Sequence, residues 1–189
     1  MEPRLEEAKA GKRTVFFVDA AHFVLSVYLG FLWCFTRVLV RAPSGRQRFN
    51  VLGALNAVTY QLITVTNDSY INAVSVGQLL ENIVALGFPS PITLIMDNAR
   101  YQRCKYVLDI AARLNIEILF LPPYSPNLNL IERLWKFVRK ECLYDKYYQH
   151  FSLFKEAISA CLSQTTTTHQ SALRSLLTLS FQSFEKLSL

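Results

Sequence analysis

The stretch LPPYSPNLNLIERLW, residues 121–135, places a carboxylate at the start of a helix. Its three prolines exclude helical backbone from the first half, because proline fixes φ and lacks an amide donor. The following residues predict a helix over 129–143, with Glu132 in its first turn. The stiff segment before this helix limits how Glu132 can be aimed.

The predicted helix has two distinct faces. At 100° per residue, its apolar side is formed by Ile131, Leu134 and Val138. Trp135, at the margin of this side, is assigned to core packing. Glu132 lies away from it, and the cations on its face are Lys136, Arg139 and Lys140. Such a face can bind a metal ion through its carboxylate and phosphate groups through its cations.

Apolar runs that alternate with helical patterns predict an α/β fold. The expected strands cover residues 14–18, 33–40, 49–58, 62–66, 92–96 and 116–121. The expected helices cover residues 70–86, 102–114, 129–143, 152–163 and 171–186. The turn at 42–46 makes 33–40 and 49–58 an antiparallel hairpin, and the run Asn67, Asp68 and Ser69 offers a cap for the helix at 70–86. The strands therefore form a mixed sheet with helices on its faces.

Asp19 and Asp97 each follow a predicted strand. If these strands are parallel neighbours, their carboxyl ends lie at one edge of the sheet and the two side chains meet. Two carboxylates so placed repel each other unless a cation lies between them, and oxygen ligands suit Mg²⁺ or Mn²⁺. Glu132 would complete a site for two such ions, the arrangement that serves in-line phosphoryl displacement.

Each acidic residue also has a purely structural interpretation. Glu132 can close a capping box with Asn129 or pair with Lys136. Asp97 can cap a helix after its strand, and Asp19 can simply end a strand. The residues taken singly leave these interpretations open.

The composition describes a basic, folded chain. Hydrophobic residues make up 51% of the 189 residues and charged residues 18%, which excludes a disordered chain. The net charge of +6 favours a polyanionic partner, above all nucleic acid. The four cysteines are widely spaced without a CxxC pair, so they indicate neither a zinc site nor a disulfide framework and fit a reducing cytoplasm.

Residues 14–35 are apolar enough to suggest a membrane span as an alternative. Asp19 and His22 lie inside this stretch, and an ionised aspartate within a bilayer costs roughly 3 kcal/mol. β-branched and aromatic residues, with a break at Gly30, favour two buried strands joined by a turn. We therefore expect no membrane association.

Three segments carry a resemblance to a known family. They are FFVDAAHF (16–23), LIMDNARYQ (94–102) and LPPYSPNLNLIERLWKFVRK (121–140). In this order they resemble the catalytic core of DDE transposases of the mariner-like insertion-sequence group, and the 34 residues between Asp97 and Glu132 are typical of that group. The resemblance covers residues 13–145. It implies a ribonuclease H-like fold, an α/β architecture with a mixed five-stranded sheet flanked by helices.

The resemblance also implies a site and partners. Asp19, Asp97 and Glu132 would bind two Mg²⁺ ions, or Mn²⁺ as a substitute, for DNA strand cleavage and strand transfer. Phosphate contacts would come from Arg133, Lys136, Arg139 and Lys140, and Asn98 would support the site. The implied partners are the DNA of the element ends, target DNA and a second copy of the chain, forming a homodimer.

The resemblance divides the chain into a lead at 1–13, a catalytic domain at 14–150 and a helical extension of that domain at 151–189. Because the family carries helix-turn-helix domains ahead of this core, we expect a downstream frame or fragment that works with an upstream helix-turn-helix polypeptide. Three positions depart from the family pattern: Ala20 where an acidic residue is common, Gln102 where histidine is frequent and Leu130 where proline is usual. The alternative function is an inactive, nucleic-acid-binding remnant of the same fold.

Overall fold

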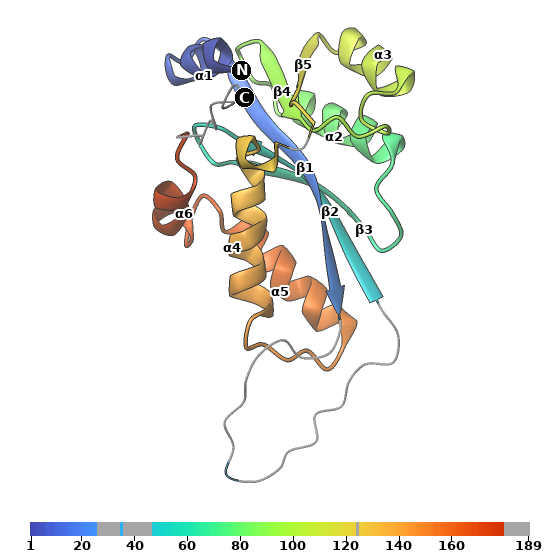
Figure 1. Cartoon of the computed structure of the whole chain (residues 1–189), viewed down its shortest axis with the longest axis vertical. Coiled ribbons are helices and arrows are strands. Elements are labelled where there is room, and N and C mark those ends of the chain that lie inside the picture. The colour runs from blue at the N-terminus through green and yellow to red at the C-terminus, as the bar shows by residue number, and fades with distance from the viewer. Residues whose placement is uncertain (26–34, 36–46, 124, 180–189) are drawn as a thin grey trace, which may run out of the picture.

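The computed structural model describes residues 1–25, 35, 47–123 and 125–179. Its centre is a five-stranded sheet with the order β3-β2-β1-β4-β5. The strands are β1 (Thr14–Leu25), β2 (Gln47–Asn56), β3 (Leu62–Asn67), β4 (Ile92–Met96) and β5 (Ile116–Phe120). β1, β2 and β3 pair antiparallel, whereas β1, β4 and β5 pair parallel (Figure 1). The predicted mixed five-stranded sheet is confirmed.

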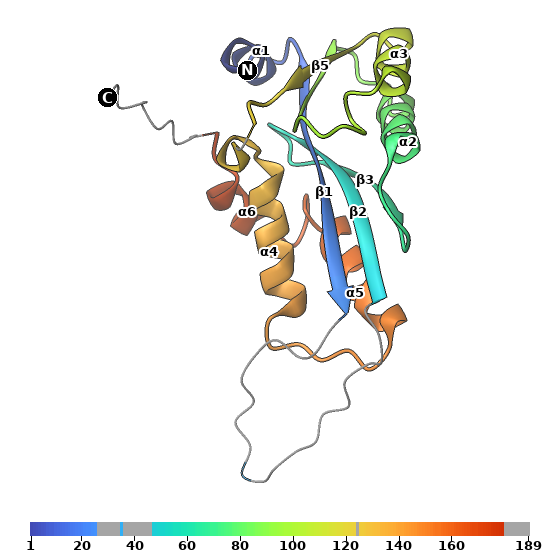
Figure 2. The same cartoon turned by 45° about the vertical axis from the view of Figure 1, so that its right-hand side comes forward.

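Helices cover both faces of the sheet, as predicted. α2 (Ala73–Ala85) and α3 (Lys105–Arg113) pack on one face, and α4 (Ile131–Leu143) packs on the other (Figure 2). α5 (Phe151–Ser163) packs beside α4. The shorter helical elements are α1 (Glu2–Lys9), the 3-10 turn η1 (Pro126–Leu128) and α6 (Gln170–Leu176).

The side chains of β1 alternate between two apolar cores. Phe16 and Val18 are fully buried with α2 and α3, whereas Phe17 and Ala21 are buried beneath α4 and α5. Asp19 has the same parity as Phe17 and Ala21, so it faces α4. The strand period alone therefore directs this carboxylate toward the helix that carries Glu132.

β1 is longer than predicted, and Asp19 does not end it. The strand runs on to Leu25, because β2 continues to pair with it beyond the ends of β4 and β5 (Figure 1). What ends near Asp19 is the parallel pairing with β4, whose last pair is Val18 and Met96. The expectation that Asp19 terminates a strand is therefore wrong, although it does stand where two strands separate.

The predicted hairpin has a different described partner. Of the expected strand at 33–40, only residue 35 is described. β2 pairs along Gln47 to Asn56 with β1, and its residues 50–55 pair with β3 on the other side. The strand predicted at 49–58 is thus placed between β1 and β3.

Several helix ends differ from the prediction for local reasons. α2 begins at Ala73, because Asn72 and Ser75 form a reciprocal capping box, whereas Asn67 ends β3. α3 begins at Lys105, three residues later than predicted. α6 ends at Leu176, and residues 180–186 of the longer predicted helix lie outside the described residues.

Helices that precede β1 and follow α4 in the sequence contribute to the core under α4. α1 buries Leu5 and Ala8 there, and α5 buries Phe154 and Ile158. Arg4 of α1 also donates a 2.8 Å hydrogen bond to Glu117 of β5.

Among the described residues, none of the helices has the length and apolar character to cross a membrane.

Candidate active site

The three predicted carboxylates line one pocket of about 500 Å³. Asp19 comes from β1, Asp97 directly follows β4 and Glu132 comes from the first turn of α4. The rest of the lining is Asn98, Ala99, Arg103, Leu121, Pro122, Pro123, Ser125 and Asn129. Within the described ranges, no three His, Cys, Asp or Glu side chains already form a set close enough to hold a metal ion. The carboxylates therefore share a pocket without forming a closed ligand shell.

The two aspartates are neighbours because β1 and β4 are in register. Val18 lies opposite Met96, so the next residue in each strand direction is an aspartate. Ile95 and Phe17 belong to the core under α4, and Asp97 and Asp19 have the same parity as these residues. The predicted convergence of Asp19 and Asp97 at the carboxyl end of a parallel pair is thus what the register produces.

Asp19 is the most strongly perturbed of the three acids. Burial raises its pKa to about 7, and the negative charges of Glu132 and Asp97 add to this shift. Two donors act in the opposite direction: the backbone amide of Ala20 and the indole of Trp135, whose Nε1 donates to Asp19 Oδ2 over 3.0 Å. Ionisation of Asp19 is therefore unfavourable in this pocket, and a bound cation would make it more favourable.

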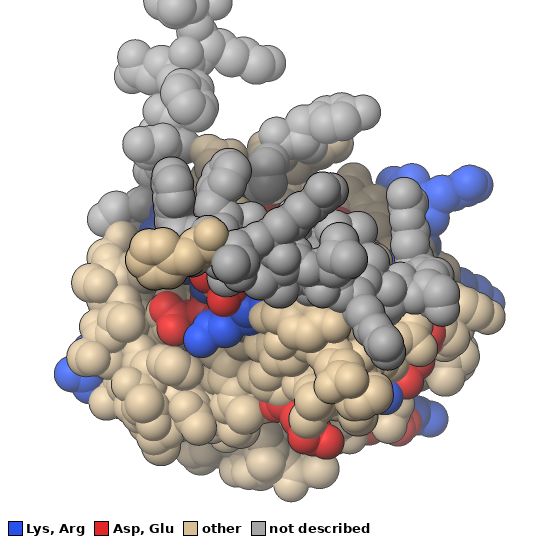
Figure 3. Space-filling model, turned by 90° about the horizontal axis from the view of Figure 1, so that it is seen from below, with Lys and Arg blue, Asp and Glu red and all other residues tan. Residues whose placement is uncertain are grey.

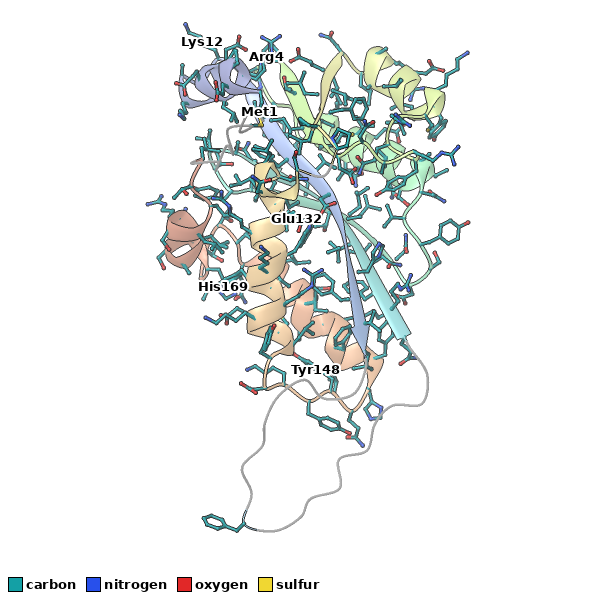
Figure 4. The ribbon with its side chains drawn as sticks, viewed as in Figure 1. Met1, Arg4, Lys12, Glu132, Tyr148 and His169 are labelled. Atoms are coloured by element: carbon teal, nitrogen blue, oxygen red, sulfur yellow. The ribbon has the colours of Figure 1, made fainter. Side chains whose placement is uncertain are left out.

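Glu132 forms neither of the two structural interactions that the sequence left open, the capping box with Asn129 and the ion pair with Lys136. No side-chain bond caps α4, so the capping box with Asn129 is absent. Asn129 instead donates from Nδ2 to the carbonyl oxygen of Val18, at 3.2 Å. Glu132 and Lys136, both described, form no ion pair with each other. Glu132 projects from α4 on the side of β1 (Figure 4).

Asp97 is oriented by the backbone that follows it. The amide of Ala99 donates to Asp97 Oδ1 at 3.3 Å, which forms a local turn. The neighbouring helix α3 starts with Cys104 as its N-cap, so Asp97 does not cap it. Asn98, expected to support Asp97, accepts a 3.3 Å hydrogen bond from Arg103 instead.

Sequence reasoning missed three residues of this pocket region. Trp135 was assigned to the core, and it is 1% exposed there, but its N–H also contacts Asp19. Arg103 lines the pocket, so it adds a cation there, and its guanidinium donates a hydrogen bond to Asn98. Asn129 was considered only as a helix cap. The YSPNLN segment before the helix pointed to this region, but no local pattern reveals contacts with β1.

The four cations predicted to contact phosphate differ in their surroundings. Arg133 donates to the carbonyl oxygen of Thr178 at 2.7 Å, which fastens the segment after α6. The Arg139 guanidinium lies 5.7 Å from the centre of the Phe23 ring. Lys136 and Lys140 are exposed. Seen from below, the described surface carries interspersed positive and negative side chains and no continuous basic face (Figure 3).

The sheet order, the flanking helices and the acidic pocket at the end of the β1–β4 pairing define the class of enzyme. The chain belongs to the DDE endonuclease superfamily, because the model described as DDE superfamily endonuclease matches residues 14–172. This is a family of enzymes that use divalent metal ions. No curated protein matches the chain by sequence.

Solved structures confirm the predicted ribonuclease H-like fold. A Mos1 transposase paired-end complex with the left transposon end has a TM-score of 0.60 at 12% identity, covering 93% of this chain and 58% of that chain. The HTLV-2 integrase catalytic core domain in complex with magnesium has a TM-score of 0.54 at 13% identity, covering 82% and 86%. A Mos1 transposase catalytic domain with raltegravir and Mg has a TM-score of 0.55 at 13% identity, covering 97% and 92%. The chain therefore has the fold of these catalytic domains and spans less than two thirds of the longer Mos1 chains.

Proposed function

We propose that this chain is the catalytic domain of a DNA transposase, which cleaves a DNA strand at the end of an element and joins it to target DNA. The observation that carries the proposal is the pocket shared by Asp19, Asp97 and Glu132 in a DDE superfamily fold. The Mos1 structures with a transposon end and in a strand transfer complex are similar in fold and support the choice of substrate.

The residues of the pocket fit divalent metal ions. The donor set consists of three carboxylates, and hard oxygen ligands of this kind suit Mg²⁺ and Mn²⁺. Burial, followed by the negative charges of Glu132 and Asp97, raises the pKa of Asp19, so a bound cation would favour its ionised form. Asp19, Asp97 and Glu132 would hold two ions, which when bound supply activation of water and stabilisation of the leaving 3′ oxygen.

The remaining residues of the pocket orient the acids and the substrate. The Trp135 indole holds one oxygen of Asp19, and the Ala99 amide holds one oxygen of Asp97. Asn98 supports the site indirectly, because it positions the Arg103 guanidinium at the pocket lining. This cation can contact a phosphate of the strand that enters the pocket. Lys136 and Lys140 are exposed farther along α4 and can hold the DNA backbone.

The partners follow from the same function. The catalytic domain at 14–150, extended by 151–189, would act on element ends and target DNA as a homodimer, since two ends must be processed together. End recognition would come from an upstream helix-turn-helix polypeptide, as the family resemblance implies. The described free cysteines, Cys104, Cys142 and Cys161, fit a cytoplasmic setting.

One observation favours an inactive nucleic-acid-binding remnant as the second candidate. Gln102 stands where the family often has histidine, and its fully buried Oε1 has no hydrogen-bond partner among the described residues. A chain that has lost the reaction could keep the fold and the exposed cations. It would not need a functioning metal site.

Metal binding separates these two candidates. We expect the wild-type chain to bind Mn²⁺ in an electron paramagnetic resonance titration, and Asp97→Asn to lose most of this binding. Asp109→Asn is the matched control, because Asp109 is exposed on α3. Equal, negligible binding by all three proteins would favour the inactive remnant.

A cleavage assay then tests the reaction. DNA that contains an element end should be nicked in the presence of Mg²⁺ when the helix-turn-helix polypeptide is supplied, and Asp97→Asn should abolish the nicks. Absence of nicking with and without that polypeptide would exclude the enzyme. Nicking by Asp97→Asn at the wild-type rate would exclude this pocket.

A further inference from the structure

Helix α4 is joined to the sheet by two polar contacts that flank Glu132. Asn129 lies three residues before Glu132 and Trp135 lies three residues after it. Both side chains are buried, with exposed fractions of 3% and 1%. Each forms a hydrogen bond to β1 at or beside Asp19, so the acid from the helix and the acid from the strand are linked through these contacts.

The Asn129 contact fixes the start of the helix. Its Nδ2 donates to the carbonyl oxygen of Val18, the last β1 residue that pairs with β4. Leu130 follows and is fully buried, so the helix start is held by packing as well as by a hydrogen bond. Removing a buried amide partner leaves a polar group unsatisfied, which destabilises the fold.

The Trp135 contact fixes the next turn of the helix. Its Nε1 donates to Asp19 Oδ2, and its ring lies against Gly53, the residue opposite Asp19 in β2. A Cβ atom at Gly53 would lie 2.8 Å from Trp135 Cη2 and 3.1 Å from Ile131 Cδ1. The first distance is shorter than real Cβ contacts and the second is tight, so the absence of a side chain at Gly53 creates the slot that the indole fills.

We propose that Asn129 and Trp135 are positioning residues that set where α4 lies on β1, and thereby where Glu132 lies relative to Asp19. The inference rests on the proposed role of the carboxylates in metal binding. Neither residue has to touch metal or DNA to act in this way. The Gly53 slot acts together with these two side chains, because it sets how closely α4 approaches the sheet.

The alternative is that Trp135 is only a core residue. The two cases differ in what Trp135→Phe does. Phenylalanine keeps an aromatic ring in the slot but removes the donor to Asp19, so a packing role would leave metal binding almost unchanged. A positioning role would weaken it, because Asp19 loses its fixed orientation.

Mn²⁺ affinity and the free energy of unfolding, measured on the same proteins, distinguish these cases. We expect Trp135→Phe and Asn129→Leu to lower Mn²⁺ affinity by about 10- to 100-fold, the range found when groups that orient metal ligands are removed. Val138→Ala is the matched control, because Val138 is fully buried on the same helix and contacts none of the three acids by a hydrogen bond. It should lower stability and keep the wild-type affinity.

A spectroscopic signal tests whether the metal binds close to Trp135 and Asp19. The chain has two tryptophans, so Trp33→Phe leaves Trp135 as the only indole. In that background, Mn²⁺ should quench the fluorescence of Trp135, and Asp97→Asn should abolish the quenching. Quenching that is absent although Mn²⁺ binds would place the metal away from Asp19 and would overturn the inference.

The Gly53 slot provides a further test. Gly53→Ala should weaken Mn²⁺ binding when Trp135 is present and should do so much less in the Trp135→Phe background, because Phe lacks the Cη2 atom that meets the new Cβ. Equal effects of Gly53→Ala in both backgrounds would show that the space at Gly53 does not act through Trp135.

The results also separate the positioning inference from the proposed function. If wild type binds Mn²⁺ and Asp97→Asn does not, while Trp135→Phe binds like wild type, only the positioning inference fails. If wild type does not bind Mn²⁺, the proposed function fails first.

Discussion

Val18 and Met96 form the last pair in the parallel register of β1 and β4, and an aspartate follows each of them. Asp19 and Asp97 therefore leave the shared pairing at one level and line the same pocket. Glu132 adds a third acid from α4. This arrangement disfavours the ionised form of Asp19, because burial and then the charge of Glu132 raise its pKa to about 7.

This shift predicts how the stability of the metal-free chain depends on pH. A raised pKa in the folded state means that Asp19 contributes stability below its unfolded value near 3.8 and loses it as pH rises through about 7. Asp19→Asn removes this loss. We expect the variant to be more stable than wild type at pH 8 by on the order of 3 kcal/mol, with the difference shrinking toward pH 4.

Urea unfolding in the presence of a chelator, at several pH values, measures this difference. The exposed Asp109→Asn serves as the control and should show a small difference that does not change with pH. An Asp19→Asn variant that is no more stable than wild type at pH 8 would show that the folded pocket does not penalise this charge.

Two glycine substitutions should differ in how much they destabilise the chain. Gly53→Ala forces a Cβ against the rigid Trp135 ring at 2.8 Å and should destabilise the chain by about 1–3 kcal/mol. Gly77→Ala meets Ile110 Cδ1 at 2.9 Å, the flexible end of a side chain. Gly77 lies inside α2, where alanine gains about 1 kcal/mol of helix propensity, so its net effect should be near zero. Urea midpoints compare the two, and similar losses would contradict this account.

Arg133 and Lys136 should separate stability from DNA binding. Arg133→Ala loses the bond to Thr178 and should destabilise the chain by about 1 kcal/mol, with a small change in DNA affinity. Lys136→Ala removes an exposed cation, so it should weaken DNA binding and lower the slope of affinity against salt by about 1 without a loss of stability. Fluorescence anisotropy at several salt concentrations measures the slope. Identical slopes for Lys136→Ala and wild type would remove Lys136 from the DNA interface.

The start of α2 offers a local test. Asn72 accepts from the Ser75 amide at 3.0 Å, and Ser75 accepts in return from the Asn72 amide at 3.4 Å. Asn72→Ala should therefore cost about 1 kcal/mol of stability. Ser69→Ala, within the run that the sequence offered as the cap, should cost almost nothing. A larger loss for Ser69→Ala, measured by thermal unfolding, would place the cap at Ser69.

Local patterns were sufficient for most of the sheet and for the helix that carries Glu132. The apolar runs of β4 and β5 and the apolar face of α4 repeat with the periods of strand and helix, which depend on neighbouring residues alone. The same patterns misplaced the start of α2, because several polar residues before it can all serve as caps. They also ended β1 too early, because a polar residue in a strand looks like a boundary until its partner strand is known.

The amino-acid sequence was enough to propose three acids, which line one pocket, and to predict that two of them meet if β1 and β4 are parallel neighbours. It did not reveal the contact between Trp135 and Asp19, two residues 116 positions apart, or the contact between Asn129 and Val18. Those contacts depend on how α4 packs on β1 and β2, and on the space left by Gly53. Periodicity is a property of neighbours along the chain, whereas the position of a helix on a sheet is settled by packing between distant segments.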